Sequence, residues 1–192
     1  MRVDATSGLV EGARFVPSPN CDARPVGAVP EVLIVHAISL PPGEFGGTAI
    51  ERLFCNSLDA GEHPYYEQIK ELRVSAHLLV RRSGEIVQFV PLHIRAWHAG
   101  QSQCEGRTRV NDFSIGVELE GCDDAPFEDT QYGVLADLTK HIMRAYPAIT
   151  STRLYGHSDI APGRKTDPGP FFDWARLRAL LGMRLAAHPA HR

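Results

Sequence analysis

Two stretches of the chain have the hydrophobic pattern of strands inside a β-sheet. Residues 31–40 contain the uninterrupted apolar run V-L-I-V, which predicts a central strand covered on both faces. Residues 113–120 instead alternate between apolar side chains and small or acidic ones. The apolar positions are Ile115, Val117 and Leu119, and the others are Ser114, Gly116, Glu118 and Glu120. This alternation predicts a strand with one face in the core. Its other face lies either beneath a cleft, with room beside Glu118, or in solvent as an acidic surface.

The same pattern predicts a hairpin and several helices. The arms A-H-L-L-V-R-R and E-I-V-Q-F-V flank the turn Ser83-Gly84, and we expect His77 in the first arm to be structural. Residues 130–146 have helical spacing, with Asp129 or Thr130 as the cap. Further predicted elements are a helical turn at 50–54 within a long connection (40–63), a short helix at 64–72, a short strand at 153–155 and a last helix capped by Asp173, with the apolar stripe Trp174, Leu177, Leu180 and Leu181.

Length and composition suit a single domain spanning residues 1–192, with 43% hydrophobic and 22% charged residues, as in soluble globular proteins. Residues 1–30 are rich in Pro and Gly, and we expect them to wrap over the core as an extended arm. We expect residues 186–192 to be a disordered tail, so His188 and His191 are discounted as ligands.

Charge and cysteine usage limit the partners and the compartment. A net charge of −3 indicates neither a nucleic-acid partner nor a membrane-surface partner. The first residues lack the apolar core of a signal peptide, and no apolar run is long enough to span a bilayer. The four cysteines have no C-x-x-C spacing, which predicts free thiols: Cys21, Cys55, Cys104 and Cys122. We expect a cytoplasmic, monomeric protein.

The densest candidate chemistry lies in residues 156–170, G-H-S-D-I-A-P-G-R-K-T-D-P-G-P. Its prolines and glycines predict a rigid loop rather than a helix or strand. Within it, His157, Lys165 and Asp167 offer an imidazole, an ammonium and a carboxylate. Such a loop either serves a functional site or is a surface loop with ordinary polar residues.

A second imidazole, His36, ends the apolar run of residues 31–40 and either lines a cleft or is a hydrogen-bonded core histidine. With His157 and Asp167 it forms a set of three ligands that leaves a fourth position for water, as in catalytic zinc sites. A zinc-activated water can attack a carbonyl carbon near neutral pH. Lys165 would then stabilise the oxyanion, and Glu118 would move the proton to the leaving amine. The sum is metal-assisted hydrolysis of an amide.

Five segments, in order, resemble one enzyme family: H-A-I-S-L-P-P-G-E-F-G-G, R-V-S-A-H-L-L-V-R-R-S-G-E-I-V-Q-F-V, R-A-W-H-A-G, N-D-F-S-I-G-V-E-L-E-G and G-H-S-D-I-A-P-G-R-K-T-D-P-G-P-F-F-D-W. The family is that of the zinc-dependent N-acetylmuramoyl-L-alanine amidases. The chain is most similar to its cytoplasmic members that act on 1,6-anhydro-N-acetylmuramyl-L-alanine in bacterial cell-wall recycling. The resemblance runs from about residue 19 to about residue 181.

This resemblance implies a mixed α/β fold, with a central mixed β-sheet flanked by helices as in peptidoglycan recognition proteins. It implies one Zn²⁺ held by His36, His157 and Asp167, with Glu118 and Lys165 as the catalytic pair. The implied substrate is an anhydromuramyl-peptide, cut between the lactyl group of the sugar and L-alanine.

Three further residues are implied to bind substrate: Arg73 and Arg109 at the peptide carboxylates, and Trp97 in the cleft wall. For each, an ordinary role remains open: a surface ion pair for either arginine and core packing for Trp97. The chain also departs from the family, because Ala37 stands where Asn commonly follows the first ligand. Two alternatives are an amidase of polymeric peptidoglycan and a muropeptide-binding module without activity.

Overall fold

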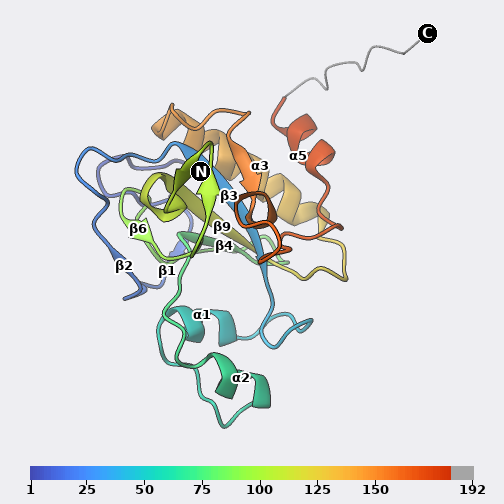
Figure 1. Cartoon of the computed structure of the whole chain (residues 1–192). Coiled ribbons are helices and arrows are strands. Elements are labelled where there is room, and N and C mark those ends of the chain that lie inside the picture. Colours follow the sequence, from blue (N-terminus) through green and yellow to red (C-terminus); the bar gives the residue numbers. More distant parts are fainter. Residues whose placement is uncertain (183–192) are drawn as a thin grey trace.

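The structure, a computed structural model, describes residues 1–182. Within this range, six strands form one mixed sheet (Figure 1). In spatial order they are β1 (Arg14–Phe15), β5 (Ile86–Gln88), β4 (Leu78–Val80), β9 (Ser114–Glu120), β3 (Val32–Ile38) and β10 (Leu154–Gly156). Strands β4, β9, β3 and β10 run parallel to one another, whereas β5 is antiparallel to β4. The chain therefore has the predicted mixed α/β architecture.

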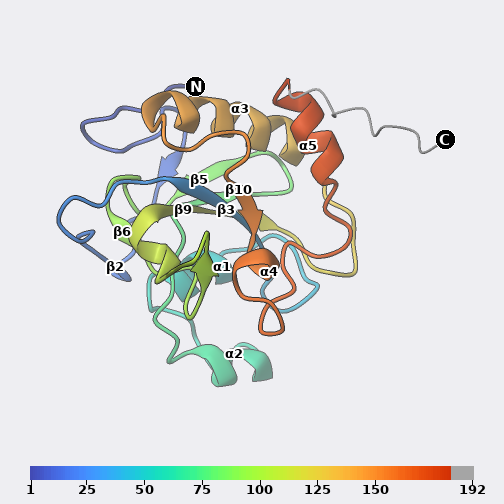
Figure 2. The ribbon, with the colours of Figure 1, turned by 45° about the horizontal axis from the view of Figure 1, so that its top comes forward.

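Helices cover both faces of this sheet (Figure 2). On one face lie α3 (Asp129–Ala145) and α5 (Trp174–Leu180), and on the other lie α1 (Ala49–Phe54) and α2 (Pro64–Ile69). The single turn α4 (His157–Ile160) follows β10 directly. The remaining short elements are β2 (Cys21–Asp22), β6 (Arg95–Ala96), β7 (Gln103–Cys104), β8 (Arg107–Thr108) and the 3₁₀ helix η1 (Val110–Phe113).

Alternation along the two longest strands divides the core. Leu33 and Val35 of β3 and Val117 of β9 pack with α3 and α5 in one apolar cluster. The opposite face of β3 carries Val32 and Ile34, which pack in a second cluster, and then His36. Both strands are interior, so every residue of β9 is buried and V-L-I-V of β3 is fully buried. The predicted central strand is confirmed.

Most predicted elements are found, with local corrections. The hairpin pairs β4 with β5, as expected. The cap of α3 is Glu128 rather than Asp129 or Thr130, and its backbone N–H donates to Gln131 Oε1 at 3.0 Å. In α5 the cap Asp173 is confirmed by its hydrogen bond from the Arg176 N–H, but Leu180 is 40% exposed and does not belong to the buried stripe.

The structure corrects the prediction for the N-terminal end of the chain. The predicted arm of residues 1–30 adds β1 to the main sheet and pairs β2 with β6, so it is partly built into the fold. The predicted tail, residues 186–192, lies outside the described residues.

All four cysteines are free, as predicted. Among residues 1–182, no helix has the length and hydrophobicity needed to cross a membrane.

Candidate metal centre and active site

Parallel pairing brings three of the predicted site residues to one edge of the sheet. In the register of β3 with β9, His36 is the direct partner of Glu118, and both side chains lie on the face opposite the α3 cluster. In the register of β10 with β3, Gly156 pairs with Val35, so His157 follows at the level of His36. Ligand sites of open α/β sheets commonly form at the carboxyl ends of such strands.

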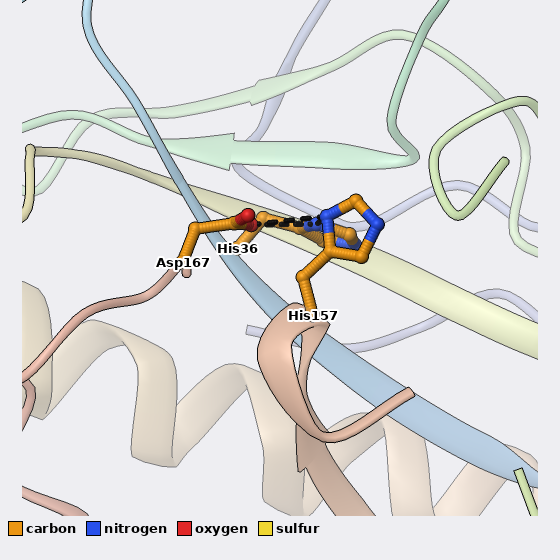
Figure 3. Close-up of side chains that lie close together, drawn as sticks. All are labelled: His36, His157 and Asp167. Atoms are coloured by element: carbon orange, nitrogen blue, oxygen red, sulfur yellow. Dashed lines mark hydrogen bonds and ion pairs between the residues drawn. The ribbon is translucent and has the colours of Figure 1, made fainter. Parts of the chain in front are cut away.

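The loop after α4 carries Asp167 back to these residues. The Ser158 N–H donates to the Asp167 carbonyl at 2.9 Å, which fixes the returning chain beside His157. Contrary to the prediction of a loop throughout, residues 157–160 form the helical turn α4. This turn directs His157 toward His36 and Asp167, as Figure 3 shows.

The three side chains present one donor atom each to a common point. His36 Nδ1 lies 3.0 Å from His157 Nδ1 and 3.2 Å from Asp167 Oδ2, and His157 Nδ1 lies 3.1 Å from Asp167 Oδ2. Ligands arranged tetrahedrally around zinc at about 2.0–2.2 Å are roughly 3.3–3.6 Å apart. The observed triangle is within a few tenths of an ångström of that spacing, so these residues fit a zinc ion with one position left for another ligand.

The proton states of the three groups also suit a cation. Burial lowers the pKa of His36 to about 4, so its imidazole is neutral at physiological pH. Burial acts to raise the pKa of Asp167, but hydrogen bonds with His157 and His36 outweigh it and hold that pKa below its ordinary value. His157 Nε2 lies 3.2 Å from the Ala99 carbonyl, which accepts the Nε2 proton and leaves Nδ1 with its electron pair.

Glu118 lies on the strand next to His36, in the interior, rather than on a solvated acidic face. It is 8% exposed, and its Oε2 has no hydrogen-bond partner among the described residues. Burial, together with the nearby charge of Asp167, raises the pKa of Glu118 well above its ordinary value. A buried carboxyl with a raised pKa can both accept and release a proton near neutral pH.

A cavity of about 550 Å³ opens over the triangle and includes Lys165 in its wall. Its lining includes the polar residues Glu118, Asp123, His157, Lys165 and Asp167 and the largely apolar residues Leu40, Leu53, Phe54, Tyr65, Ile69 and Leu72. The volume is in the range of small-ligand sites. The cavity therefore brings together four of the five residues predicted to act in catalysis or metal binding, and the fifth, His36, contacts two of them from just outside the lining.

The three predicted substrate-binding residues lie outside the lining of this cavity. Arg73 is exposed and donates to the carbonyls of Lys70 and Leu72. Arg109 is exposed and pairs with Asp112 at 3.0 Å. Trp97 is half-buried, and its indole N–H donates to Asp22 at 3.1 Å. The structure thus does not bring these three side chains together with the metal-ligand candidates.

Two other histidines, His77 and His98, lie in the same buried region. The Gly116 N–H donates to His77 Nδ1, and His77 Nε2 lies 3.0 Å from the Ile94 carbonyl, so both ring nitrogens are engaged, as expected of a structural histidine. His98 was not singled out as a site residue, yet it lines the cavity and contacts His36. The sequence offered only its place beside Trp97 in R-A-W-H-A-G, one of the segments that carry the family resemblance, and nothing there indicated a contact with His36.

Curated relatives share most of the chain. It is 57% identical over 174 residues to the 1,6-anhydro-N-acetylmuramyl-L-alanine amidase AmpD of Escherichia coli (strain K12), covering 91% of this chain and 94% of that protein. It is 49% identical to the AmpD of Haemophilus influenzae, covering 90% of this chain and 94% of that protein.

Solved structures agree with the fold. The crystal structure of an AmpD selenomethionine derivative matches with a TM-score of 0.91 at 56% identity, covering 94% of this chain and 99% of that one. The E. coli amidase AmiD, in complex with anhydro-N-acetylmuramic acid-L-Ala-D-γ-Glu-L-Lys, matches with a TM-score of 0.59 at 34% identity, covering 83% and 61%. The N-acetylmuramoyl-L-alanine amidase family model (Amidase_2) matches residues 26–170, and the chain belongs to this family.

Proposed function

We propose that this protein is a zinc-dependent amidase that hydrolyses the bond between 1,6-anhydro-N-acetylmuramic acid and L-alanine of the stem peptide. The observation that carries the proposal is the donor triangle of His36, His157 and Asp167, 3.0–3.2 Å on each side, beside the buried Glu118. The names of the AmpD relatives support the choice of substrate, and so does the anhydromuramyl-peptide bound to AmiD.

His36, His157 and Asp167 would hold the zinc ion. When bound, zinc supplies Lewis-acid polarisation of the scissile carbonyl and activates a water molecule at neutral pH. Glu118 accepts a proton from the attacking water and delivers it to the amine of L-alanine as the C–N bond breaks. The products are a free peptide and the lactyl carboxylate of the anhydro sugar.

Lys165 has the role of an electrostatic partner in this proposal. Lys165 belongs to the cavity wall that also contains Glu118 and Asp167. It stabilises the negative charge that develops on the amide oxygen in the transition state. The Lys165 side chain is exposed and has no hydrogen-bond or salt-bridge partner within residues 1–182, so no such contact holds it away from this charge.

We propose that substrate recognition involves Arg73 and Arg109 at the peptide carboxylates, because a guanidinium group can hold a carboxylate through two hydrogen bonds. Trp97 is proposed as a more distant wall of the same cleft. Ala37 lines the cavity and offers no side-chain hydrogen bond, so any polar contact beside the metal must come from other residues.

The test is product analysis with zinc-loaded protein and anhydromuramyl-tripeptide, alongside the reducing-end muramyl-tripeptide and intact sacculi. We expect release of free tripeptide from the anhydro substrate. Peptide release from sacculi alone would favour an amidase of polymeric peptidoglycan, and binding without any release would favour a module without activity. Cytoplasmic action on soluble muropeptides is part of the proposal, and cell fractionation tests it.

A further inference from the structure

His98 lies directly behind the metal-ligand candidate His36. Its ring is buried, with 8% of the residue exposed, and it meets the His36 ring edge to face with centroids 5.0 Å apart. His98 Nδ1 lies 2.9 Å from His36 Nε2, and His98 Nε2 lies 3.0 Å from Ser114 Oγ. His98 therefore links the first residue of β9 to the nitrogen of His36 that is not part of the donor triangle.

Two proton arrangements satisfy this chain of contacts. In the first, His36 Nε2–H donates to His98 Nδ1, and His98 Nε2–H donates to Ser114 Oγ. In the second, the Ser114 hydroxyl donates to His98 Nε2, and His98 Nδ1–H donates to His36 Nε2. A neutral imidazole carries one N–H, so the second arrangement places the remaining proton of His36 on Nδ1. Only the first leaves His36 Nδ1 free to bind a cation.

The other ligand histidine, His157, needs no side chain to select its tautomer. The Ala99 carbonyl can only accept a hydrogen bond, so it fixes the proton of His157 on Nε2. Among residues 1–182, no carbonyl or carboxylate contacts His36 Nε2, and a second imidazole, that of His98, takes this place. Ligand histidines generally depend on such a partner for their tautomer and ring orientation. The identity of the partner thus decides what His36 offers to a metal.

The surrounding chain gives the His98 ring little freedom. A Cβ at Gly116 of β9 would lie 2.5 Å from the ring atoms Cγ and Nδ1 of His98. The imidazole therefore fits only because this position has no side chain. The Asn111 side-chain oxygen accepts the backbone N–H groups of His98 and Ala99, at 3.2 and 2.8 Å. One amide therefore holds the segment that supplies the partners of both ligand histidines.

We propose that His98 is a positioning residue whose Nδ1 accepts the Nε2 proton of His36 and so holds His36 with Nδ1 directed at the metal. This inference rests on the proposed zinc site and adds a residue to it. It assigns His98 no contact with substrate and no proton transfer during turnover.

Two substitutions separate this role from simple packing. Asn in place of His98 can put its side-chain oxygen near the position of Nδ1, whereas the longer Gln side chain places its amide near the position of Nε2. We therefore expect His98→Asn to bind zinc within about threefold of the unmodified protein, and His98→Gln to bind about 10–100-fold more weakly. The dissociation constants are measured by competition with a chromophoric chelator. If His98 only fills space, the larger Gln is the milder change, and an equal or reversed order would overturn the proposal.

A measurement on the unmodified protein does not depend on how the variants fold. Long-range ¹H–¹⁵N spectra of the imidazoles distinguish a protonated nitrogen from an unprotonated one. We expect zinc-loaded protein to show His98 protonated at Nε2 and unprotonated at Nδ1; the opposite tautomer would refute the positioning role. Protein that binds no zinc at all would remove the proposed function itself, whereas tight zinc binding with the wrong tautomer or the wrong order of variants would remove this inference alone.

Discussion

The surroundings shift the pKa values of the two carboxyl groups of the candidate site, Glu118 and Asp167, in opposite directions. Burial raises the pKa of Glu118, whereas hydrogen bonds with His36 and His157 lower the pKa of Asp167 in spite of its burial. Groups whose environments push their pKa values apart can take different roles in one cavity. Asp167 suits a permanently ionised ligand, and Glu118 suits a group that gains and loses a proton.

Replacing Glu118 with Gln removes the proton acceptor while keeping the shape of the side chain. We expect the turnover number for anhydromuramyl-tripeptide to fall roughly 10²–10⁴-fold, as is typical for a lost general base. Zinc content should be unchanged, because Glu118 is not one of the three donors. The exposed Glu67, paired with Lys70 on α2, provides the control Glu67→Gln, which should keep full activity. Near-normal turnover of Glu118→Gln would exclude Glu118 from the chemistry.

The raised pKa of Glu118 also predicts how the stability of the metal-free protein depends on pH. Between the ordinary value of 4.5 and the higher folded-state pKa, the folded protein binds more protons than the unfolded chain. The free energy of unfolding should therefore fall relative to Glu118→Gln as pH rises above 4.5, by about 1.4 kcal/mol per pH unit, until the folded-state pKa is passed. Urea unfolding of both proteins across this range measures the difference, and parallel curves would show that Glu118 is not perturbed.

At the scale of elements, the register of three parallel strands places the chemistry. The pairs His36–Glu118 and Val35–Gly156 bring side chains from distant parts of the sequence to one level of the sheet. The hydrophobic pattern predicted β3 and β9, because interior strands have strongly biased sequences. It could not predict their register or the turn α4, since four residues are too few to show a helical period.

The close packing of β9 against His98 gives a test at this scale. Gly116→Ala places a methyl group 2.5 Å from the His98 ring, which His36 and Ser114 hold from other sides. We expect it to lower the free energy of unfolding by about 1–3 kcal/mol, as overpacking typically does, and to weaken zinc binding.

The matched control is Gly133→Ala on the exposed face of α3, where a Cβ meets nothing within 4 Å. Alanine there should raise the free energy of unfolding by about 0.5–1 kcal/mol through its better helix propensity. Urea unfolding measures both variants. A Gly116→Ala protein as stable as the unmodified one would mean that His98 is free to move away.

At the scale of the whole molecule, the sequence predicted those site residues whose own side-chain type indicates a role. It did not predict residues whose role depends on a tertiary contact. His157, Asp167, Glu118 and Lys165 line one cavity, and His36 meets His157 and Asp167 in the donor triangle, as their residue types and the family resemblance indicated. The role of His98 depends on a contact between β9 and the segment after β6, which no local pattern encodes. The same is true of the positions of Arg73, Arg109 and Trp97, whose partners are set by tertiary packing.

The most direct test of the proposed zinc site is an anomalous difference map, measured at the zinc absorption edge, from crystals of the zinc-loaded protein. We expect one strong peak per chain, about 2.0–2.2 Å from His36 Nδ1, His157 Nδ1 and Asp167 Oδ2. In crystals of Asp167→Ala this peak should be lost, because two imidazoles alone make an incomplete site. A peak elsewhere, or one that persists unchanged in Asp167→Ala, would contradict the assignment of these three ligands.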